Sequence, residues 1–190
     1  MFPVPRMDTA ETFAWWQGAF TEQELDKLQN IAKKAEMKGE IGRGEVNNHI
    51  RETDLYWVGP EEKYLWVYQK LGRVVAEVNT KYFGFDIDGF NEPLQFCNYK
   101  AKKKGHYTYH VDRGPYRNGV RKLTVVVQLS DPDTYKGGEL LLKTADEDTV
   151  ASNERGMITM FPSWTLHKVT PVTKGSRQSL VAWITGPPFK

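Results

Sequence analysis

Two histidines and an aspartate carry the strongest chemical signal in the sequence. His110 and Asp112 stand two residues apart, so within a β-strand both side chains point to the same side and can reach one point. His167 opens a separate strand-like segment and supplies a third ligand. Two histidines and one carboxylate form the facial ligand set of mononuclear non-haem iron sites, which leaves coordination positions open, whereas a structural zinc site is closed. Read singly, a His-X-Asp motif is usually a surface hydrogen-bonding pair, and His167 alone is no stronger a signal.

Composition narrows the classes of protein. The 190 residues, 39% hydrophobic and 26% charged, fit one globular domain and exclude disordered and membrane classes. A formal charge of +2 is too small to indicate a nucleic-acid partner. The lone Cys97 excludes an intramolecular disulfide, and no apolar run is long enough for a secretory signal or a membrane span. We therefore expect a cytoplasmic protein.

The elements that must position the three ligands follow from periodicity. A capping box from Thr21 to Glu24 predicts a first amphipathic helix that runs toward Gly39. Pro60 opens a second helix, which Gly84 ends. The polar segment between them, Ile41 to Val58, is interpreted as strands or a loop over a site.

After Pro93 the chain changes to short strand-like segments separated by glycine-rich turns. These segments predict a mostly β fold with flanking α, a barrel or jelly roll with the two helices packed outside it. One domain spans residues 1–190, with an amino-terminal helical and substrate-covering part over 1–92 and a catalytic core over 93–187. The predicted strands are Leu94–Lys100, Leu123–Leu129, Glu139–Leu142, Met157–Phe161, His167–Val172 and Ser179–Ile184.

Three stretches in a fixed order carry a resemblance to a known family. They are YKAKKKGHYTYHVD (99–112), YKGGELLL (135–142) and RGMITMFPSWTLHKVTPVTKGSRQSLVAWITGP (155–187), preceded by HIRETDLYWV (49–58). In these stretches the sequence resembles the 2-oxoglutarate and Fe(II)-dependent oxygenase superfamily, in particular its prolyl 4-hydroxylase-like branch of small bacterial and phage enzymes. The resemblance implies a double-stranded β-helix core and the ligand triad His110, Asp112 and His167.

The resemblance also implies a site for 2-oxoglutarate. Arg177, ten residues after His167, stands where these enzymes keep a basic residue for the distal carboxylate, and a guanidinium forks two hydrogen bonds onto such a group. Tyr99 and Tyr107 would lie near the cosubstrate, and Ser179 would add a hydroxyl on the side of Arg177. Leu140 and Val169 would form apolar walls, and Trp183 would close the pocket.

Each of these positions also has a purely structural interpretation. The tyrosines and Trp183 fit core or rim packing, Ser179 fits an outward strand position, and Lys102-Lys103-Lys104 fits a charged loop. Thr124 and Gln128 rank below the tyrosines as residues facing the cosubstrate. Candidates for substrate contact, mostly in a mobile covering segment from Gly42 to Trp57, are Arg51, Tyr56, Trp57 and Arg113.

The resemblance implies oxidation of a C–H bond by O2, coupled to conversion of 2-oxoglutarate to succinate and carbon dioxide, with ascorbate as a candidate reductant. The expected substrate is a prolyl residue of a peptide or protein. A nucleobase or small molecule is a second interpretation, weakened because no second arginine completes the Arg-X-Asn-X5-Arg pattern of nucleic-acid demethylases. A non-catalytic, cupin-like metal-binding module is a third, and it gives Arg177 no role. The sequence leaves the oligomeric state open.

Overall fold

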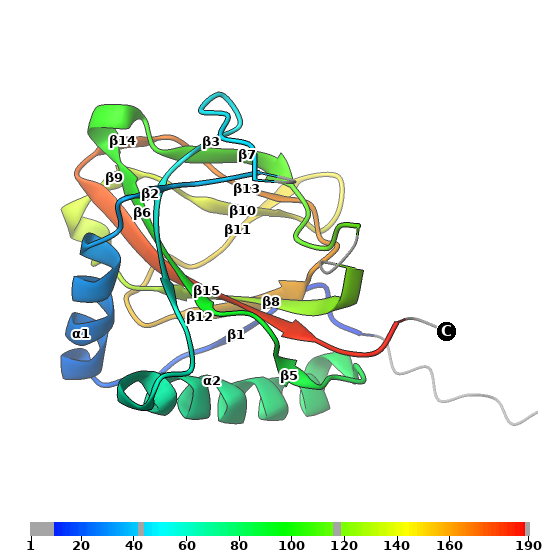
Figure 1. Cartoon of the computed structure of the whole chain (residues 1–190). Helices are drawn as coiled ribbons and strands as arrows, with labels where there is room; N and C mark the ends of the chain where they lie inside the picture. The colour runs from blue at the N-terminus through cyan, green and yellow to red at the C-terminus, as the bar shows by residue number, and fades with distance from the viewer. Residues whose placement is uncertain (1–9, 42–43, 116–118, 189–190) are drawn as a thin grey trace, which may run out of the picture.

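Two helices and two antiparallel sheets are the main elements of the protein (Figure 1). They are seen in a computed structural model, which describes residues 10–41, 44–115 and 119–188. Every strand pair within the two sheets is antiparallel. The fold is therefore mostly β, as the sequence predicted, with helices along one side.

Helix α1 (Glu22–Lys33) begins at the predicted capping box. The Thr21 hydroxyl accepts a hydrogen bond from the backbone N–H of Glu24, and the Glu24 carboxylate accepts one from the N–H of Thr21. Its buried face consists of Leu25, Leu28 and Ala32. The helix ends near Lys34, short of the predicted Gly39.

The second helical segment has three parts: the 3-10 turn η1 (Glu62–Tyr64), the α-helix α2 (Leu65–Val78) and the π-helical turn η2 (Asn79–Phe83). Gly84 ends it as predicted, with a left-handed backbone (φ 64°) that favours glycine. Its buried face lies against the large sheet and consists of Val67, Leu71, Val74, Val75 and Val78.

The large sheet has the strand order β1-β12-β8-β15-β6-β4-β2, with β5 paired to β15. Its central strands are β8 (Arg121–Gln128), β15 (Ser176–Thr185) and β6 (Leu94–Lys100), and its outer strands are β1 (Ala14–Trp16), β12 (Ile158–Pro162), β4 (Asp54–Val58), β2 (Met37–Lys38) and β5 (Gly89–Phe90).

The small sheet has the order β11-β10-β13-β7-β3 and faces the large sheet (Figure 1). Its strands are β11 (Asp148–Val150), β10 (Leu140–Lys143), β13 (His167–Val169), β7 (His106–His110) and β3 (Arg51–Glu52). The pair β9 (Lys136–Gly137) and β14 (Val172–Lys174) and the 3-10 turns η3 (Ala101–Lys103) and η5 (Pro132–Thr134) complete the described elements.

The large sheet separates two apolar clusters because alternate side chains of its strands point to opposite faces. On β8, Val125 and Val127 join the helices in one cluster, while Val126 joins the small sheet in the other. Both helices therefore cover the outer face of the large sheet, and the inner face is left to line whatever lies between the two sheets.

Three details differ from the predictions. The strand predicted over His167–Val172 is two strands, β13 and β14, broken at Thr170-Pro171. Asp112 lies beyond the end of β7, so alternation along a strand does not explain its position. In the proposed covering segment, β3 and β4 are fixed members of the two sheets, and Gly42 and Arg43 lie outside the described residues. Among the helices described, none is long and apolar enough to cross a membrane.

Candidate active site

The three predicted ligands come together between the two sheets. One ligand atom from each of His110, Asp112 and His167 lies within 4.8 Å of the others. The Nε2 atoms of His110 and His167 are 3.8 and 3.5 Å from the two carboxylate oxygens of Asp112. Among the described residues, this is the one group of three or more His, Cys, Asp or Glu side chains with metal-binding geometry.

Both histidines have their orientation fixed by backbone carbonyls. His110, at the end of β7, is paired directly with His167 at the start of β13. The His110 Nδ1 lies 2.8 Å from the carbonyl of Thr108, and the His167 Nδ1 lies 2.9 Å from that of Thr165. Because a carbonyl only accepts, each Nδ1 carries the proton and each Nε2 keeps its lone pair for a metal.

Asp112 is positioned by neighbouring strands. Its backbone N–H donates to the carbonyl of Ser163 (2.9 Å), and its carboxylate accepts from the Thr124 hydroxyl (2.8 Å). Thr124, itself fully buried, also lies 3.1 Å from the Ser163 hydroxyl. The Arg121 guanidinium donates to the carbonyl of Asp112 (3.0 Å).

The electrostatics favour the ligand state of His110 and Asp112. Burial, and then the neighbouring His167, lower the pKa of His110 to about 3, so its imidazole is neutral at physiological pH. Burial raises the pKa of Asp112, but the two imidazoles and the hydroxyl of Thr124 outweigh it, so the net pKa is lowered and the carboxylate is ionised. Two imidazoles and one carboxylate suit a divalent transition metal.

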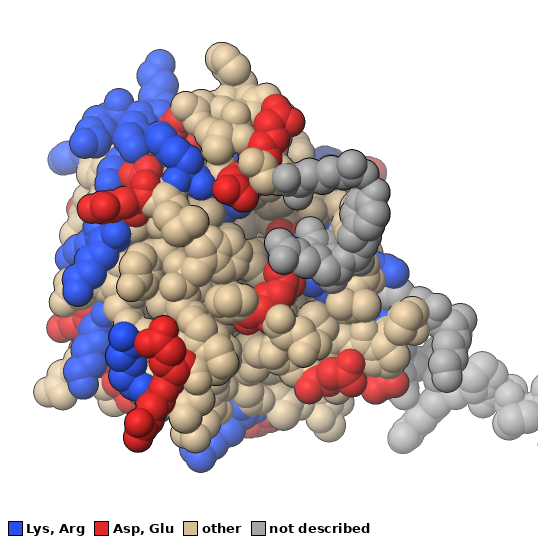
Figure 2. Space-filling view, in the orientation of Figure 1, with Lys and Arg blue, Asp and Glu red and all other residues tan. Residues whose placement is uncertain are grey.

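The ligands open into a cavity of about 840 Å³ between the sheets. Figure 2 shows the surface hollowed in this region, beside acidic side chains. The lining residues alternate along β15 and β6, as a sheet face requires. From β15 they are Arg177, Ser179, Val181 and Trp183; from β6, Gln95, Cys97 and Tyr99; and from β8, Arg121, Thr124 and Val126.

Arg177 is the exceptional charge in this lining. Its side chain is 4% exposed, and none of the described side chains or carbonyls forms an ion pair or hydrogen bond with its guanidinium. Its nearest aromatic neighbour is the Tyr99 ring, 5.8 Å from the guanidinium carbon. A buried cation without an anion is costly, so the arrangement fits an anionic guest.

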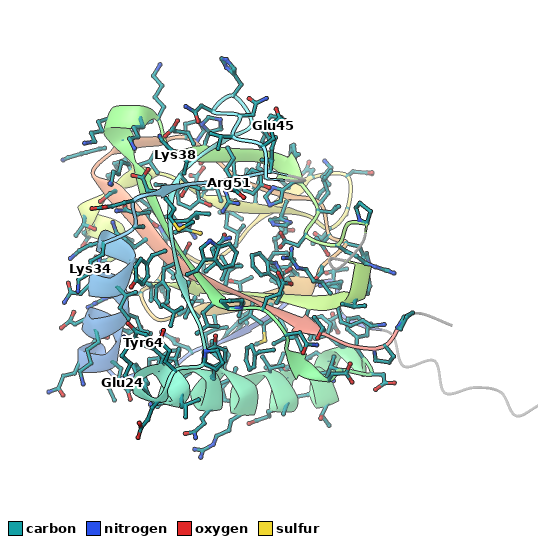
Figure 3. The ribbon with its side chains drawn as sticks, in the orientation of Figure 1. Glu24, Lys34, Lys38, Glu45, Arg51 and Tyr64 are labelled. Atoms are coloured by element: carbon teal, nitrogen blue, oxygen red, sulfur yellow. The ribbon has the colours of Figure 1, made fainter. Side chains whose placement is uncertain are left out.

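Arg51 is a second buried arginine of the cavity, projecting from β3 (Figure 3). It donates to the side-chain oxygen of Gln95 (2.7 Å) and to the carbonyl of Glu40 (3.1 Å), while its Nε has no partner among the described residues. Its guanidinium carbon lies 4.6 Å from the centre of the Tyr107 ring, which stacks on His110 at 3.4 Å. Arg51 is therefore a fixed part of the cavity wall.

All the predicted cosubstrate residues line this cavity: Tyr99, Tyr107, Leu140, Val169, Arg177, Ser179 and Trp183. Burial raises the pKa of Tyr99, which keeps its phenol protonated and able to donate. Of the substrate candidates, Arg51, Trp57 and Arg113 also line it, but Tyr56 does not: it points to the other side of β4 and is 38% exposed.

Thr124 and Arg121 are the residues that sequence reasoning underrated or missed. Arg121 forms two hydrogen bonds with Glu92, at 2.6 and 2.5 Å, and stacks over Trp183 with its guanidinium carbon 3.8 Å from the ring centre. Strand parity in β8 could have signalled Thr124, because it shares the inner face with Val126. Nothing local signals the pairing of Arg121 with a residue 29 positions away.

Comparisons with known proteins agree with this geometry. The family model of the 2OG-Fe(II) oxygenase superfamily matches residues 94–185. A PKHD-type hydroxylase of Synechococcus sp. (strain CC9605) is 46% identical over 79 residues, 41% of this chain and 36% of the relative. One of Prochlorococcus marinus is 39% identical over 85 residues, 45% and 38% of the two chains. The matches thus span little more than a third of the length of these curated relatives.

Solved structures share the fold over most of the chain. A prolyl hydroxylase from Trichoplax adhaerens, in complex with a peptide fragment of hypoxia inducible factor, superposes with a TM-score of 0.76 at 18% identity, covering 92% of this chain and 83% of that one. A Pseudomonas putida prolyl-4-hydroxylase gives 0.73 at 18% identity, with 92% of both chains covered. The sequence match over the cavity-forming strands agrees with the resemblance: residues 94–185 of this chain match the family model of the 2OG-Fe(II) oxygenase superfamily, and the fold is shared with these structures.

Proposed function

We propose that the chain is an Fe(II)- and 2-oxoglutarate-dependent dioxygenase that hydroxylates a C–H bond of a peptide or protein, at a prolyl residue. The observation that carries the proposal is Arg177: a buried guanidinium without an acidic partner, in the same cavity as His110, Asp112 and His167. A non-catalytic metal module would have no use for that charge. The prolyl substrate rests on the prolyl hydroxylases among the structural neighbours.

The chain's own residues would bind and orient. His110 and His167, through Nε2, and Asp112, through its carboxylate, would hold Fe(II), and Arg177 would hold the distal carboxylate of 2-oxoglutarate with Tyr99 and Ser179 as neutral donors beside it. Bound iron and cosubstrate would supply the oxidising chemistry with O2. Leu140 and Val169 would keep water from the reacting centre.

At the mouth, Trp57 and Arg113 would contact the substrate. Trp57 packs against Trp183 with ring centres 6.0 Å apart, so an apolar ring entering the cavity would meet an aromatic wall. Arg51 would contribute indirectly, by holding the Tyr107 ring in the cavity wall that the substrate meets.

The finer architecture follows the same proposal. We interpret the two facing sheets as a double-stranded β-helix covering residues 93–187, with residues 1–92 forming a helical and substrate-covering part of the same domain. A cytoplasmic location, supported by the lone Cys97, and ascorbate as a reductant complete the proposal.

Purified protein supplied with Fe(II), ascorbate and 2-oxoglutarate should release succinate faster when proline-containing peptides are added. Mass spectrometry should find one added oxygen on a prolyl residue. The His110→Gln variant serves as the control that lacks a ligand. Turnover of 2-oxoglutarate that no peptide stimulates would remove the prolyl substrate and leave the oxygenase class, whereas an absence of any turnover and of 2-oxoglutarate binding would remove both.

A further inference from the structure

One end of the molecule is rich in lysine. Figure 2 shows basic side chains gathered at the upper left, over η3, β14 and the end of β6. These elements adjoin: the backbone N–H of Ala101 donates to the carbonyl of Gly175 at 3.0 Å. We define the lysine-rich end by Lys100, Lys102, Lys103, Lys104, Lys136 and Lys174.

Its positive charge is only partly balanced. Lys100 and Lys103 share the buried carboxylate of Asp54, each at 2.8 Å. Exposed Lys102 and Lys104 form no ion pair with a described acidic residue, and neither do Lys136 and Lys174. The nearby acids Asp131 and Asp133 cap their own turn through backbone hydrogen bonds or face solvent.

The fold adds like charges here rather than avoiding them. Lys136 and Lys174 are directly paired across β9 and β14. Like charges in that position are destabilising. With a chain balance of only +2, the concentration at one end leaves the rest of the surface near neutral or acidic.

The lysine-rich end is continuous with the mouth of the cavity. Lys38 (labelled in Figure 3) lines the cavity. It forms an ion pair with Glu52 at 3.0 Å, two residues before the Asp54 that holds Lys103. The hollow and the basic side chains lie on the same face in Figure 2. A chain that enters the cavity can therefore extend over the lysines.

We propose that the lysine-rich end binds an acidic segment of the protein substrate, at a distance along the chain from the residue that enters the cavity. The inference rests on the proposed function and adds the substrate's charge pattern to it. Lysine ammoniums are flexible point charges that suit an acidic segment of irregular structure. The residues that define this end include no aromatic side chain on which a base could stack. That composition favours a protein over a nucleic acid.

The test compares two proline-containing peptides of equal length, one with a run of glutamates beside the proline-bearing part and one with glutamines in their place. A triple variant, Lys102→Gln with Lys104→Gln and Lys174→Gln, removes three exposed charges. We expect the wild-type KM to be about tenfold lower for the acidic peptide, from a few ion pairs of modest strength. The triple variant should lose that preference with unchanged kcat, and added salt should weaken it in the wild type.

A matched control replaces three lysines elsewhere, Lys27→Gln with Lys63→Gln and Lys81→Gln, and should keep the preference. Equal KM values for the two peptides in the wild type would overturn the proposal. An equal rise in KM for both peptides in the triple variant would also overturn it. So would a single-stranded oligonucleotide that binds the wild type through these lysines more tightly than the acidic peptide does.

Fluorescence anisotropy of labelled peptides separates this inference from the proposed function, because it needs no turnover. Lysine-dependent binding of the acidic peptide without hydroxylation of any prolyl residue would leave the docking surface and remove the prolyl substrate. Hydroxylation without a charge preference would do the reverse.

Discussion

The cavity has two ends that differ in how their polar side chains are paired: the metal end with His110, Asp112 and His167, and the end with Arg177. At the metal end, the second nitrogen of each histidine faces a backbone carbonyl, and the Asp112 carboxylate accepts from Thr124. At the other end, where we propose that 2-oxoglutarate binds, the Arg177 guanidinium has no acceptor among the described residues. Arg177 and His167 are buried and His110 and Asp112 are half-buried, so the two ends differ more in pairing than in exposure.

The comparison indicates which end is complete within the chain. A metal site whose ligands are already oriented needs only the ion, because the hydrogen bonds behind the ligands fix their geometry in advance. A buried arginine without a counterion costs folding free energy until an anion arrives. Binding of a dicarboxylate should therefore stabilise the protein far more than the contacts with its neutral neighbours alone would suggest.

Removing the charge of Arg177 should have the largest effect. In Arg177→Met, the affinity for 2-oxoglutarate should fall by roughly 100-fold, about 3 kcal/mol, because two charge-assisted hydrogen bonds are lost. Metal binding should be nearly unchanged. Isothermal titration with 2-oxoglutarate in the presence of Mn(II) measures both.

The control is Arg155→Met, which removes an arginine whose partners, Glu22 and Asp26, lie on the surface of α1. It should leave both affinities unchanged. Wild-type affinity for 2-oxoglutarate in Arg177→Met would show that the anion is held elsewhere, with Arg51 the next candidate.

The same substitution should stabilise the protein in the absence of ligands. Replacing an unpaired buried cation by an apolar side chain of similar length should raise the free energy of unfolding by about 2 kcal/mol. Urea unfolding of the metal-free protein, followed by circular dichroism, checks the sign. Destabilisation instead would mean that the guanidinium is already compensated in the ligand-free protein.

The sequence predicted the elements that carry the two ends better than the contacts between those elements. Strand periodicity and the helix-capping residues predicted both helices and the longer strands β6, β8, β10, β12 and β15, because each depends on neighbours close in the chain. The resemblance implied the place of Arg177, and alternation along the same strand predicted that of Ser179. The partners of Arg121 and Arg51, and the outward direction of Tyr56, depend on strand order and register across the sheet, which no local pattern encodes.

The stability of the metal end should depend on pH. The pKa of His110 is lowered in the folded protein to about 3, against an ordinary value of 6.5, so below pH 6.5 the unfolded chain binds a proton that the folded chain does not. The metal-free protein should lose stability as pH falls from 6.5, with a slope of at most about 1.4 kcal/mol per pH unit from this residue.

The window from pH 6.5 to about 5.5 suits this test, because the lowered pKa values of Asp112 and Glu24 affect stability mainly near and below their ordinary values of 3.8 and 4.5. Urea unfolding across that window should give a flatter profile for His110→Gln than for the wild type. Equal slopes would mean that His110 is accessible to protons in the folded protein.

Thr124 tests whether the metal end is complete in advance. Thr124→Val keeps the shape and removes the hydroxyl that donates to Asp112 at 2.8 Å and meets Ser163. We expect a loss of metal affinity of about tenfold, near 1.4 kcal/mol, because the carboxylate is then free to turn away from the two imidazoles. Thr124→Ser, which restores the donor, should recover most of it, while the 2-oxoglutarate affinity of the metal-loaded protein changes little in either variant. Titration with Co(II), followed by its absorption, measures the affinity independently of turnover.

An unchanged affinity in Thr124→Val would mean that the backbone contact of Asp112 with Ser163 alone fixes the ligand. The hydrogen bond from Thr124 would then not distinguish the metal end from the end with Arg177.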